Sequence, residues 1–530
     1  MLYVLYSKKK YPMKKLIYIF ITAVAVTFSS CNDWLLEPAP GVTKLEDFFT
    51  VGKTSIQTTN GAYVPLMWEF NNTYFPEWFI GDVASDDALK GGQSIGDMAD
   101  AYDFENFKTN SNNSFLLEFY RAQYQGISRC NLGIQQIPLM KTDTVMDARV
   151  QKRLIGELKF LRAMYYFRLV RIYGGVPLTL DPINSSAEWK KPRATTAAIY
   201  TQIITDLTEA NNGLWKKSQY ASTELGRATK GAAQAMLLKA NLYTKAYSEA
   251  KRWGDSIMLS NEYDLVANYA DNFTLAGENG KESVFEIQYM SDPTSDYGQG
   301  DGFTRGTFTV ILTRSRSSKL GGGWGFNKPT QNLYNEYEAN DPRRDATILN
   351  PKDTEIETPS QEIYLGSRYI NRKYALMNAD NTYFELEHPT RGPINNKVIR
   401  YADVLLMYAE ACAETNDLIG AKNALEKVRL RARKGAAILP AFPYGTYADN
   451  KVDLIKAVRH ERRVELAMEG HRWFDLCRWG VAKQTMDAYK ASETAEAQAQ
   501  MAAFIAGKHE LFPIPSQEID LNPMDQNPNY

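Results

Sequence analysis

The sequence has few of the residues from which disulfide frameworks, metal sites and histidine-based catalysis are built. No C-x-x-C or other metal-type spacing occurs, and three cysteines remain once Cys31 is set aside, so we predict no disulfide framework. These three lie among helical, partly apolar neighbours, where a free cysteine behaves as a small hydrophobic residue. The four cysteines are Cys31, Cys130, Cys412 and Cys477, and the four histidines are His388, His460, His471 and His509.

Motifs of common enzyme classes are missing as well. There is no H-E-x-x-H zinc motif and no G-x-x-x-x-G-K-[ST] phosphate loop. The GGGWG cluster (321–325) lacks the preceding strand and following helix of a cofactor loop, which favours a simple turn. Asp86 and Asp87 are adjacent acids, not the opposed pair about 5–10 Å apart that glycosidases use, so a capping role is the simpler interpretation.

The charge balance argues against nucleic acid as a partner. The 61 basic and 62 acidic residues give a formal net charge of -1, and no stripe of Lys or Arg follows the N-terminus. A surface that binds nucleic acid needs such a basic footprint to neutralise phosphates. With 44% hydrophobic and 23% charged residues, the composition is that of a globular protein.

The N-terminus has the pattern of an export signal. A Lys-Lys pair precedes an almost wholly apolar run over residues 16–28, and Ser-Ser-Cys31 follows. This arrangement is typical of a secretory signal peptide, and the run is shorter than the ~20 residues of a membrane-spanning helix. Cysteine directly after small residues predicts lipidation at Cys31, and several acyl chains anchor a protein firmly. We predict a signal peptide over 1–30, with Met13 as an alternative start, and a lipid-anchored segment over 31–59.

Apolar residues recur at three- and four-residue steps in several stretches, which predicts helices. The first runs from Leu158 to Ile172 and closes at Gly174-Gly175 and Pro177, since Gly permits the left-handed turn and Pro cannot continue a helix. Helix pairs joined by short turns predict stacked hairpins of the tetratricopeptide kind, although no clean 34-residue period is present. The other predicted helices cover residues 228–247, 398–414, 418–431, 452–468 and 473–479.

Two regions break this helical pattern. Residues 60–120 are rich in aromatic residues, Asn, Asp and Gly, and residues 260–396 carry loops and a short strand-like piece over 284–289. Long irregular segments are usually functional or disordered, and the interleaved rings argue against disorder. We therefore predict loop-rich ligand-binding regions here, on a helical scaffold formed mainly by residues 120–260 and 397–480.

The segment ERRVELAMEGHRWFDLCRWG (461–480) is dense in Arg, Glu and Asp. Its spacing fits a half-buried ion-pair network that joins two helices better than an active site, because buried charges need partners. The segment resembles the C-terminal hallmark of the SusD/RagB family of Bacteroidetes outer-membrane lipoproteins. Other matching stretches follow the family order: CNDWLL (31–36), ELKFLRAMYYFRLVRIYGGVPL (157–178), GRATKGAAQAMLLKANLY (226–243), VIRYADVLLMYAEA (398–411) and LFPIPSQEIDLNPMDQNPNY (511–530).

The resemblance implies a mainly α fold: a tetratricopeptide-like helical-hairpin scaffold with irregular ligand-binding insertions and a few short strands, in one unit over 60–530. It implies a lipid-anchored protein of the outer membrane that faces the cell exterior and forms a lid on a SusC-type TonB-dependent transporter. Family members bind glycans or, in the RagB branch, peptides, and they are not enzymes. No cofactor or metal is implied; structural calcium stays open, without a spaced acidic motif to support it.

Ligand recognition is expected in the irregular regions, where flat rings can lie on the C–H faces of sugars and amides or Arg can bind hydroxyls. We predict glycan capture without catalysis; a RagB-type peptide-binding protein is the alternative, and a surface hydrolase with unrecognised carboxylates is less favoured. Core packing is the competing interpretation for each predicted ligand-binding residue. By position relative to the family scaffold, these residues are Tyr102, Tyr289, Tyr297, Phe303, Arg305, Trp324 and Asn327.

Overall fold

A computed structural model describes the chain from residue 45 onward, except for 70–76, 184, 186–187, 294–304, 379–381 and 434–437. The chain divides into two units, Met1–Val51 and Gly52–Tyr530. The described part of the first unit contains the short helix α2 (Leu45–Phe48). The predicted signal peptide and Cys31 lie outside the described residues, and the predicted boundary between residues 59 and 60 falls inside helix α3.

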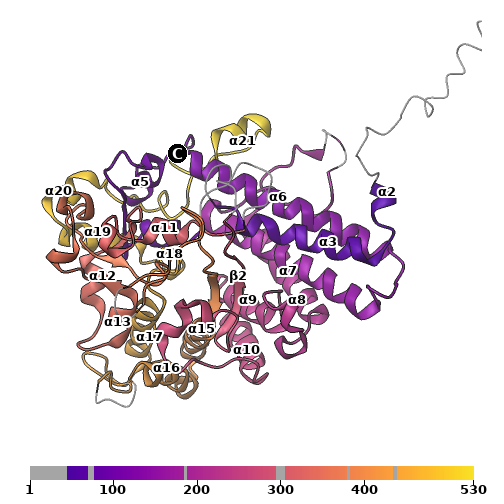
Figure 1. Cartoon of the computed structure of the whole chain (residues 1–530). Coiled ribbons are helices and arrows are strands. Elements are labelled where there is room, and N and C mark those ends of the chain that lie inside the picture. Colours follow the sequence, from indigo (N-terminus) through magenta and orange to yellow (C-terminus); the bar gives the residue numbers. More distant parts are fainter. Residues whose placement is uncertain are drawn as a thin grey trace, which may run out of the picture. The chain divides into compact units, whose positions relative to one another are not determined.

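Long helices stacked in chain order form the scaffold of the second unit (Figure 1). From α6 to α10 each helix packs against the next, α10 packs against α15, and α15 packs against α16 and α17. This arrangement confirms the predicted scaffold of helical hairpins. The scaffold helices are α3 (Gly52–Tyr63), α6 (Ser114–Gln136), α7 (Ala148–Tyr173), α8 (Thr196–Gly213), α9 (Lys230–Tyr243), α10 (Tyr247–Met258), α15 (Tyr401–Glu414), α16 (Leu418–Arg433) and α17 (Lys451–Leu466).

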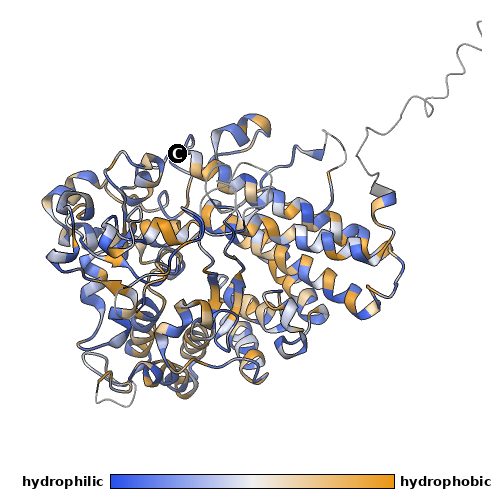
Figure 2. Ribbon diagram, in the orientation of Figure 1, coloured by the Kyte–Doolittle hydropathy of each residue, from blue (hydrophilic) through white to orange (hydrophobic). Residues whose placement is uncertain are grey.

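Helix α7 shows how the sequence sets these elements. The Asp147 side chain accepts a hydrogen bond from Val150 N at 2.7 Å and caps the start, and Gly174, with a φ of 71°, ends the helix as predicted. Helices α3, α6 and α8 cover α7, so even Arg162 is buried, where its guanidinium pairs with Asp206 on α8 at 2.7 Å. Figure 2 shows hydrophobic residues interspersed with hydrophilic ones along these helices. No helix in the described ranges is long and apolar enough to cross a bilayer.

The loop-rich part contains short antiparallel strand pairs. Within the described residues, β1 (Ala88–Gly91) pairs with β3 (Phe326–Pro329), β2 (Ser283–Ile287) with β6 (Asn396–Arg400), and β4 (Ile348–Leu349) with β5 (Ile370–Asn371). Of the predicted strand-like piece over 284–289, residues 284–287 belong to strand β2 and residues 288–289 lie beyond its end. Residues 398–400, predicted as the start of a helix, instead end strand β6, because Ile399 pairs with Phe285 of β2.

Short helices complete the second unit. The α-helices are α4 (Glu77–Val83), α5 (Ala99–Glu105), α11 (Thr309–Thr313), α12 (Gln331–Glu336), α13 (Pro342–Thr347), α14 (Pro359–Glu362), α18 (Arg472–Trp479), α19 (Ala482–Ser492), α20 (Ala495–Gln500) and α21 (Ser516–Leu521). The 3-10 helices are η2 (Val64–Met67), η3 (Ile137–Leu139), η5 (Lys217–Gln219), η6 (Ser222–Glu224), η7 (Tyr269–Phe273), η8 (Leu275–Gly277), η9 (Ser318–Leu320) and η10 (Asp353–Glu355).

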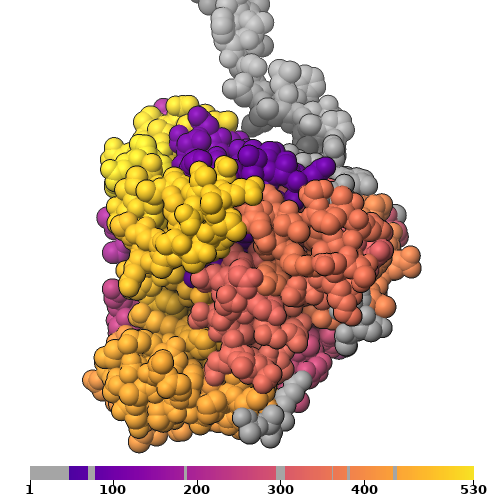
Figure 3. Space-filling model, turned by 90° about the vertical axis from the view of Figure 1, so that its left-hand side faces the viewer, coloured from indigo at the N-terminus to yellow at the C-terminus, as the bar shows by residue number. Residues whose placement is uncertain are grey.

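The C-terminal part of the chain returns to the early loop region. Figure 3 shows it in yellow beside the indigo segment that carries α5. Ala502 N donates to Asn106 O at 2.9 Å, and Ser516 N donates to Ser111 O at 2.8 Å. These backbone hydrogen bonds join segments that are far apart in the sequence.

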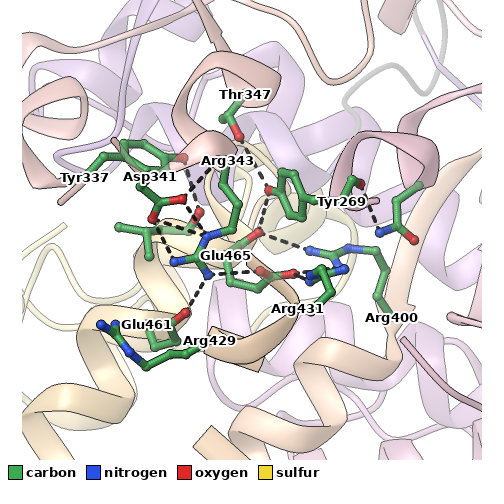
Figure 4. A network of polar contacts seen from close by, with 12 residues as sticks. Tyr269, Tyr337, Asp341, Arg343, Thr347, Arg400, Arg429, Arg431, Glu461 and Glu465 are labelled. Carbon is green, nitrogen blue, oxygen red and sulfur yellow. Dashed lines mark hydrogen bonds and ion pairs between the residues drawn. The ribbon is translucent and has the colours of Figure 1, made fainter. Parts of the chain in front are cut away.

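A network of buried charges joins the scaffold to the loop-rich part (Figure 4). Glu465 of α17 contacts Arg343 at 3.1 Å, Arg400 at 3.0 Å and Arg431 at 2.5 Å. Burial alone raises the pKa of Glu465, but the charges of these arginines outweigh it and lower the pKa to about 2. Glu461, one turn earlier, contacts Arg343 at 2.5 Å. The dense charge of the 461–480 segment is therefore structural, as its spacing predicts.

We expect Arg343→Met to lower the free energy of unfolding by about 3–5 kcal/mol, because the substitution removes a fully buried cation from three buried carboxylates. Those carboxylates belong to Asp341, Glu461 and Glu465. Denaturant unfolding followed by circular dichroism measures the effect.

Arg252→Met on α10 is the control. Arg252 pairs with Glu249 at 2.7 Å, but both side chains are more than half exposed, and exposed pairs contribute about 0–1 kcal/mol. Equal losses in the two variants would show that burial of the network does not set its contribution.

Candidate functional site

Three segments of the loop-rich part lie side by side beyond the end of β2. Met290 N donates to Arg305 O at 2.9 Å, and Thr307 and Gly392 exchange backbone hydrogen bonds of 2.8 and 2.9 Å. Side chains alternate along an extended segment, so Tyr289 is buried at 8% exposure and Met290 is 53% exposed. The outward side of this segment is thus open to solvent.

Three aromatic rings reach the surface next to these segments: Trp324, Tyr383 and Phe384, which we call the aromatic surface. Tyr383 and Phe384 are each 37% exposed, and Trp324 is half-buried. The Trp324 ring lies against the buried Phe308 ring, with centroids 5.8 Å apart. Its backbone N–H donates to Ile311 O at 2.8 Å, which ties the GGGWG turn to helix α11.

Arg314 joins the two parts of the aromatic surface. Its guanidinium donates to Ala375 O at 2.8 Å and to Phe384 O at 2.6 Å, and it lies 5.1 Å from the Tyr383 ring centroid. Burial lowers the pKa of Arg314 to about 10. The turn needs glycine at position 323, because a Cβ there would lie 2.4 Å from the Cβ of Arg314.

Glu69 lies behind the aromatic surface and is almost fully buried. Its carboxylate accepts hydrogen bonds from Thr307 Oγ1 at 2.6 Å, Phe308 N at 2.7 Å, Tyr289 Oη at 3.1 Å and Thr309 Oγ1 at 3.2 Å. Burial raises the pKa of Glu69, and the hydrogen bond from Thr307 and the charge of Arg391 act in the opposite direction.

A cavity of about 50 Å³ lies between the scaffold and the loop-rich part, with Tyr289 in its wall. Trp78 Nε1 and Gln123 Oε1, which also belong to lining residues, have no hydrogen-bond partner within the described part of the chain. A space of this size fits a few water molecules and is too small for a sugar ring.

The predicted ligand-binding residues occupy different environments. Trp324 belongs to the aromatic surface, and Arg305, whose side chain is 56% exposed, pairs with Asp292 at 3.4 Å beside Met290. Tyr289 is buried behind them, where its hydroxyl reaches Glu69. These three therefore share one region of the loop-rich part.

The other predicted residues do not join that group. Tyr102 of α5 is 8% exposed, and its hydroxyl donates to Gln500 at 3.1 Å. Asn327 of β3 is fully buried and donates to Asp82 at 3.0 Å. Tyr297 and Phe303 lie outside the described residues. A ligand role for the whole set remains a prediction.

The sequence analysis did not select Tyr383, Phe384, Arg314 or Glu69. Tyr383 and Phe384 lie within the predicted ligand-binding region 260–396. Two consecutive aromatic residues in this region were the sequence feature that could have identified them. Arg314 and Glu69 act through backbone and hydroxyl partners far away in the chain, so no local pattern marks them.

The adjacent acids Asp86 and Asp87 are held in ion pairs. Arg463 contacts Asp86 at 2.9 Å and Asp87 at 2.8 Å, and Arg472 contacts Asp86 at 2.7 Å. Burial alone raises the pKa of Asp86, but the charges of Arg463 and Arg472 outweigh it and lower the pKa to about 2. Both arginines come from the hallmark segment, so this pair anchors β1 and α4 to the scaffold. In the described ranges, no group of three or more His, Cys, Asp or Glu side chains is placed to hold a metal ion.

Asp82 holds α4 against the turn between α17 and α18. Its carboxylate accepts hydrogen bonds from Gly470 N at 2.8 Å and Asn327 Nδ2 at 3.0 Å. Position 470 needs glycine, because its φ is 77° and a Cβ would lie 2.4 Å from Trp78 Cα. Burial raises the pKa of Asp82 to about 8, which favours the protonated carboxyl in the folded protein.

We expect Asp82 to make the protein less stable as pH rises. The folded pKa of about 8 exceeds the ordinary value of 3.8 for an aspartate, so its stabilising contribution is complete below about pH 4 and is lost as pH approaches 8. Asp82→Asn removes this titration. Melting temperatures of both proteins across pH 4 to 9 should therefore show wild type falling relative to the variant, and parallel curves would contradict the raised pKa.

The chain matches two family models. Residues 281–530 match the model described as SusD family, and residues 77–242 match the model described as starch-binding associating with outer membrane. Together these matches cover scaffold and loop-rich part alike. The chain belongs to the SusD/RagB family, as its motifs predict.

Known proteins resemble the chain over most of its length. A solved laminarin binding SusD-like protein is 29% identical, with a TM-score of 0.76 over 91% of this chain and 100% of that chain. Surface glycan-binding protein A from Bacteroides thetaiotaomicron, solved with laminarihexaose, is 24% identical, with a TM-score of 0.75 over the same shares. A SusD-like protein of Formosa agariphila is 26% identical over 98% of this chain and 100% of its own length.

Proposed function

We propose that the chain is a non-catalytic outer-membrane lipoprotein that binds a glycan at the aromatic surface and passes it to a SusC-type TonB-dependent transporter. The observation that carries the proposal is the Trp324 ring, which is half-buried, backed by Phe308 and fixed by a turn that Arg314 links to two exposed rings. A ring held in this way offers a flat apolar face to the C–H groups of a sugar at little entropic cost. Arg305, whose side chain is 56% exposed three residues before Phe308 in the chain, can donate to hydroxyl groups.

The relatives support a glycan as the ligand class. The laminarin binding protein exceeds a quarter identity and shares the fold over its full length, and one matching family model is described as starch-binding. The ion pairs of Asp86 and Asp87 favour a structural role for these two carboxylates over the hydrolase alternative at this position.

Trp324→Ala should weaken glycan binding by about 30-fold, which corresponds to the ~2 kcal/mol that a central aromatic contact contributes. The measurement is calorimetry of the soluble chain from Asn32 onward with laminarin and starch oligosaccharides, after a screen of polysaccharides by affinity electrophoresis.

Trp189→Ala is the matched control, since Trp189 is 64% exposed on the loop before α8. Equal affinities of wild type and Trp324→Ala would refute the proposed site. If no glycan binds to wild type, the same titration with peptide mixtures tests the RagB-type alternative, and turnover of a glycan would favour the hydrolase.

The proposed lipid anchor has its own test. Cys31→Ala should move the protein from the membrane fraction to the soluble fraction of the producing cells and abolish incorporation of a labelled fatty acid. Cys130→Ala is the control, because Cys130 is a buried free cysteine of α6. Membrane retention of Cys31→Ala equal to that of wild type would show that the chain is held in another way.

A further inference from the structure

Glu69 is connected to the aromatic surface through a single short stretch of chain. Its four hydrogen bonds come from Tyr289 and from the consecutive residues Thr307, Phe308 and Thr309. The side chain is 4% exposed, and both carboxylate oxygens accept two of these bonds each. The carboxylate therefore fixes where the polypeptide turns into helix α11.

The orientation of Trp324 depends on that helix. Phe308 immediately precedes α11 and forms the surface on which the Trp324 ring lies. In the middle of α11, Ile311 O accepts the hydrogen bond from Trp324 N. Arg391 contacts the residues that precede α11. Its guanidinium lies 3.8 Å from the Phe308 ring centroid and donates to Gly306 O at 3.0 Å. A shift of residues 307–309 would thus move both contacts of Trp324.

We propose that Glu69 is a positioning residue for the aromatic surface, which sets glycan affinity by holding Phe308 and Trp324 in place without touching the ligand. The inference rests on the proposed function of that surface. It assigns a ligand-linked role to a residue of the early loop region that lies more than two hundred positions from the ring it positions.

The chemistry of the carboxylate makes the inference testable with a nearly isosteric change. A carboxylate is acceptor-only and suits four donors, whereas glutamine replaces one oxygen by a donor NH₂ group. In Glu69→Gln at least one pair of donors would face that NH₂ group, and a buried donor left without an acceptor is costly. We expect the 307–309 stretch to relax away from position 69.

The experiment is a double-mutant cycle of Glu69→Gln and Trp324→Ala with laminarin oligosaccharides, each variant being checked by circular dichroism. Glu69→Gln should weaken binding about tenfold, as expected for disruption of a buried hydrogen-bond site. The double variant should bind no more weakly than Trp324→Ala alone, because the two residues act through one ring. Unchanged affinity of folded Glu69→Gln, or losses that add in the double variant, would overturn the inference.

Glu157→Gln separates positioning from general stability. Glu157 is also a fully buried glutamate that accepts from a tyrosine hydroxyl, that of Tyr63 at 2.9 Å, but it lies on scaffold helix α7. It should change the melting temperature without changing glycan affinity. If Glu69→Gln fails to fold, Thr307→Val removes one donor to Glu69 and should weaken binding in the same direction; unchanged affinity of that variant would then overturn the inference.

A ligand-free measurement distinguishes failure of this inference from failure of the proposed function. Hydrogen exchange of the Phe308 amide should be faster in Glu69→Gln than in wild type and unchanged in Glu157→Gln, since Phe308 N donates to Glu69. If wild type binds no glycan but this exchange accelerates, the proposed function fails while the positioning role stands. Equal exchange rates in wild type and Glu69→Gln would overturn the positioning role itself.

Discussion

Burial of the charged hallmark segment constrains the rest of the second unit, because a buried charge costs several kcal/mol unless partners surround it. Glu465 meets this demand with Arg343, Arg400 and Arg431, which come from α13, β6 and α16. Each partner must arrive at the same point of α17 from a different part of the chain. The network therefore fixes the loop-rich part against the scaffold more strictly than apolar packing would, since hydrogen-bonded ion pairs tolerate little displacement.

The same segment also positions the early loop region. Arg463 and Arg472 bind the Asp86 and Asp87 carboxylates, and Gly470 N donates to Asp82. These contacts hold α4 and β1, and β1 in turn pairs with β3 directly after the turn that carries Trp324. The aromatic surface is thus supported from two directions, by the hallmark segment through β1 and β3 and by Glu69 through α11.

The scaffold could be predicted from sequence because helix periodicity and end signals are local, as the exact end of α7 at Gly174 shows. Prediction was wrong at residues 398–400, where pairing of Ile399 with Phe285 overrides a helix-compatible pattern. Asn327 shows that sequence spacing alone could not identify the exposed residues of the candidate site. Trp324, three residues earlier, is half-buried, whereas Asn327 is fully buried and donates a hydrogen bond to Asp82. Which of two nearby polar or aromatic residues faces solvent depends on a strand partner that spacing does not reveal.

A ligand-binding surface needs aromatic rings that are held rigidly and are also exposed to solvent. In this structure the exposed rings and the buried groups that hold them are different residues. Trp324, Tyr383 and Phe384 lie in loop segments outside the helices and strands, and their rings are partly exposed. The groups that hold these segments, Arg314 and Glu69, are buried and bind mainly backbone atoms and hydroxyls. Because Arg314 and Glu69 bind mainly backbone atoms, the loop segments can keep their positions when one exposed aromatic residue is replaced by another. Rings that are held in fixed positions lose little conformational entropy when a ligand binds.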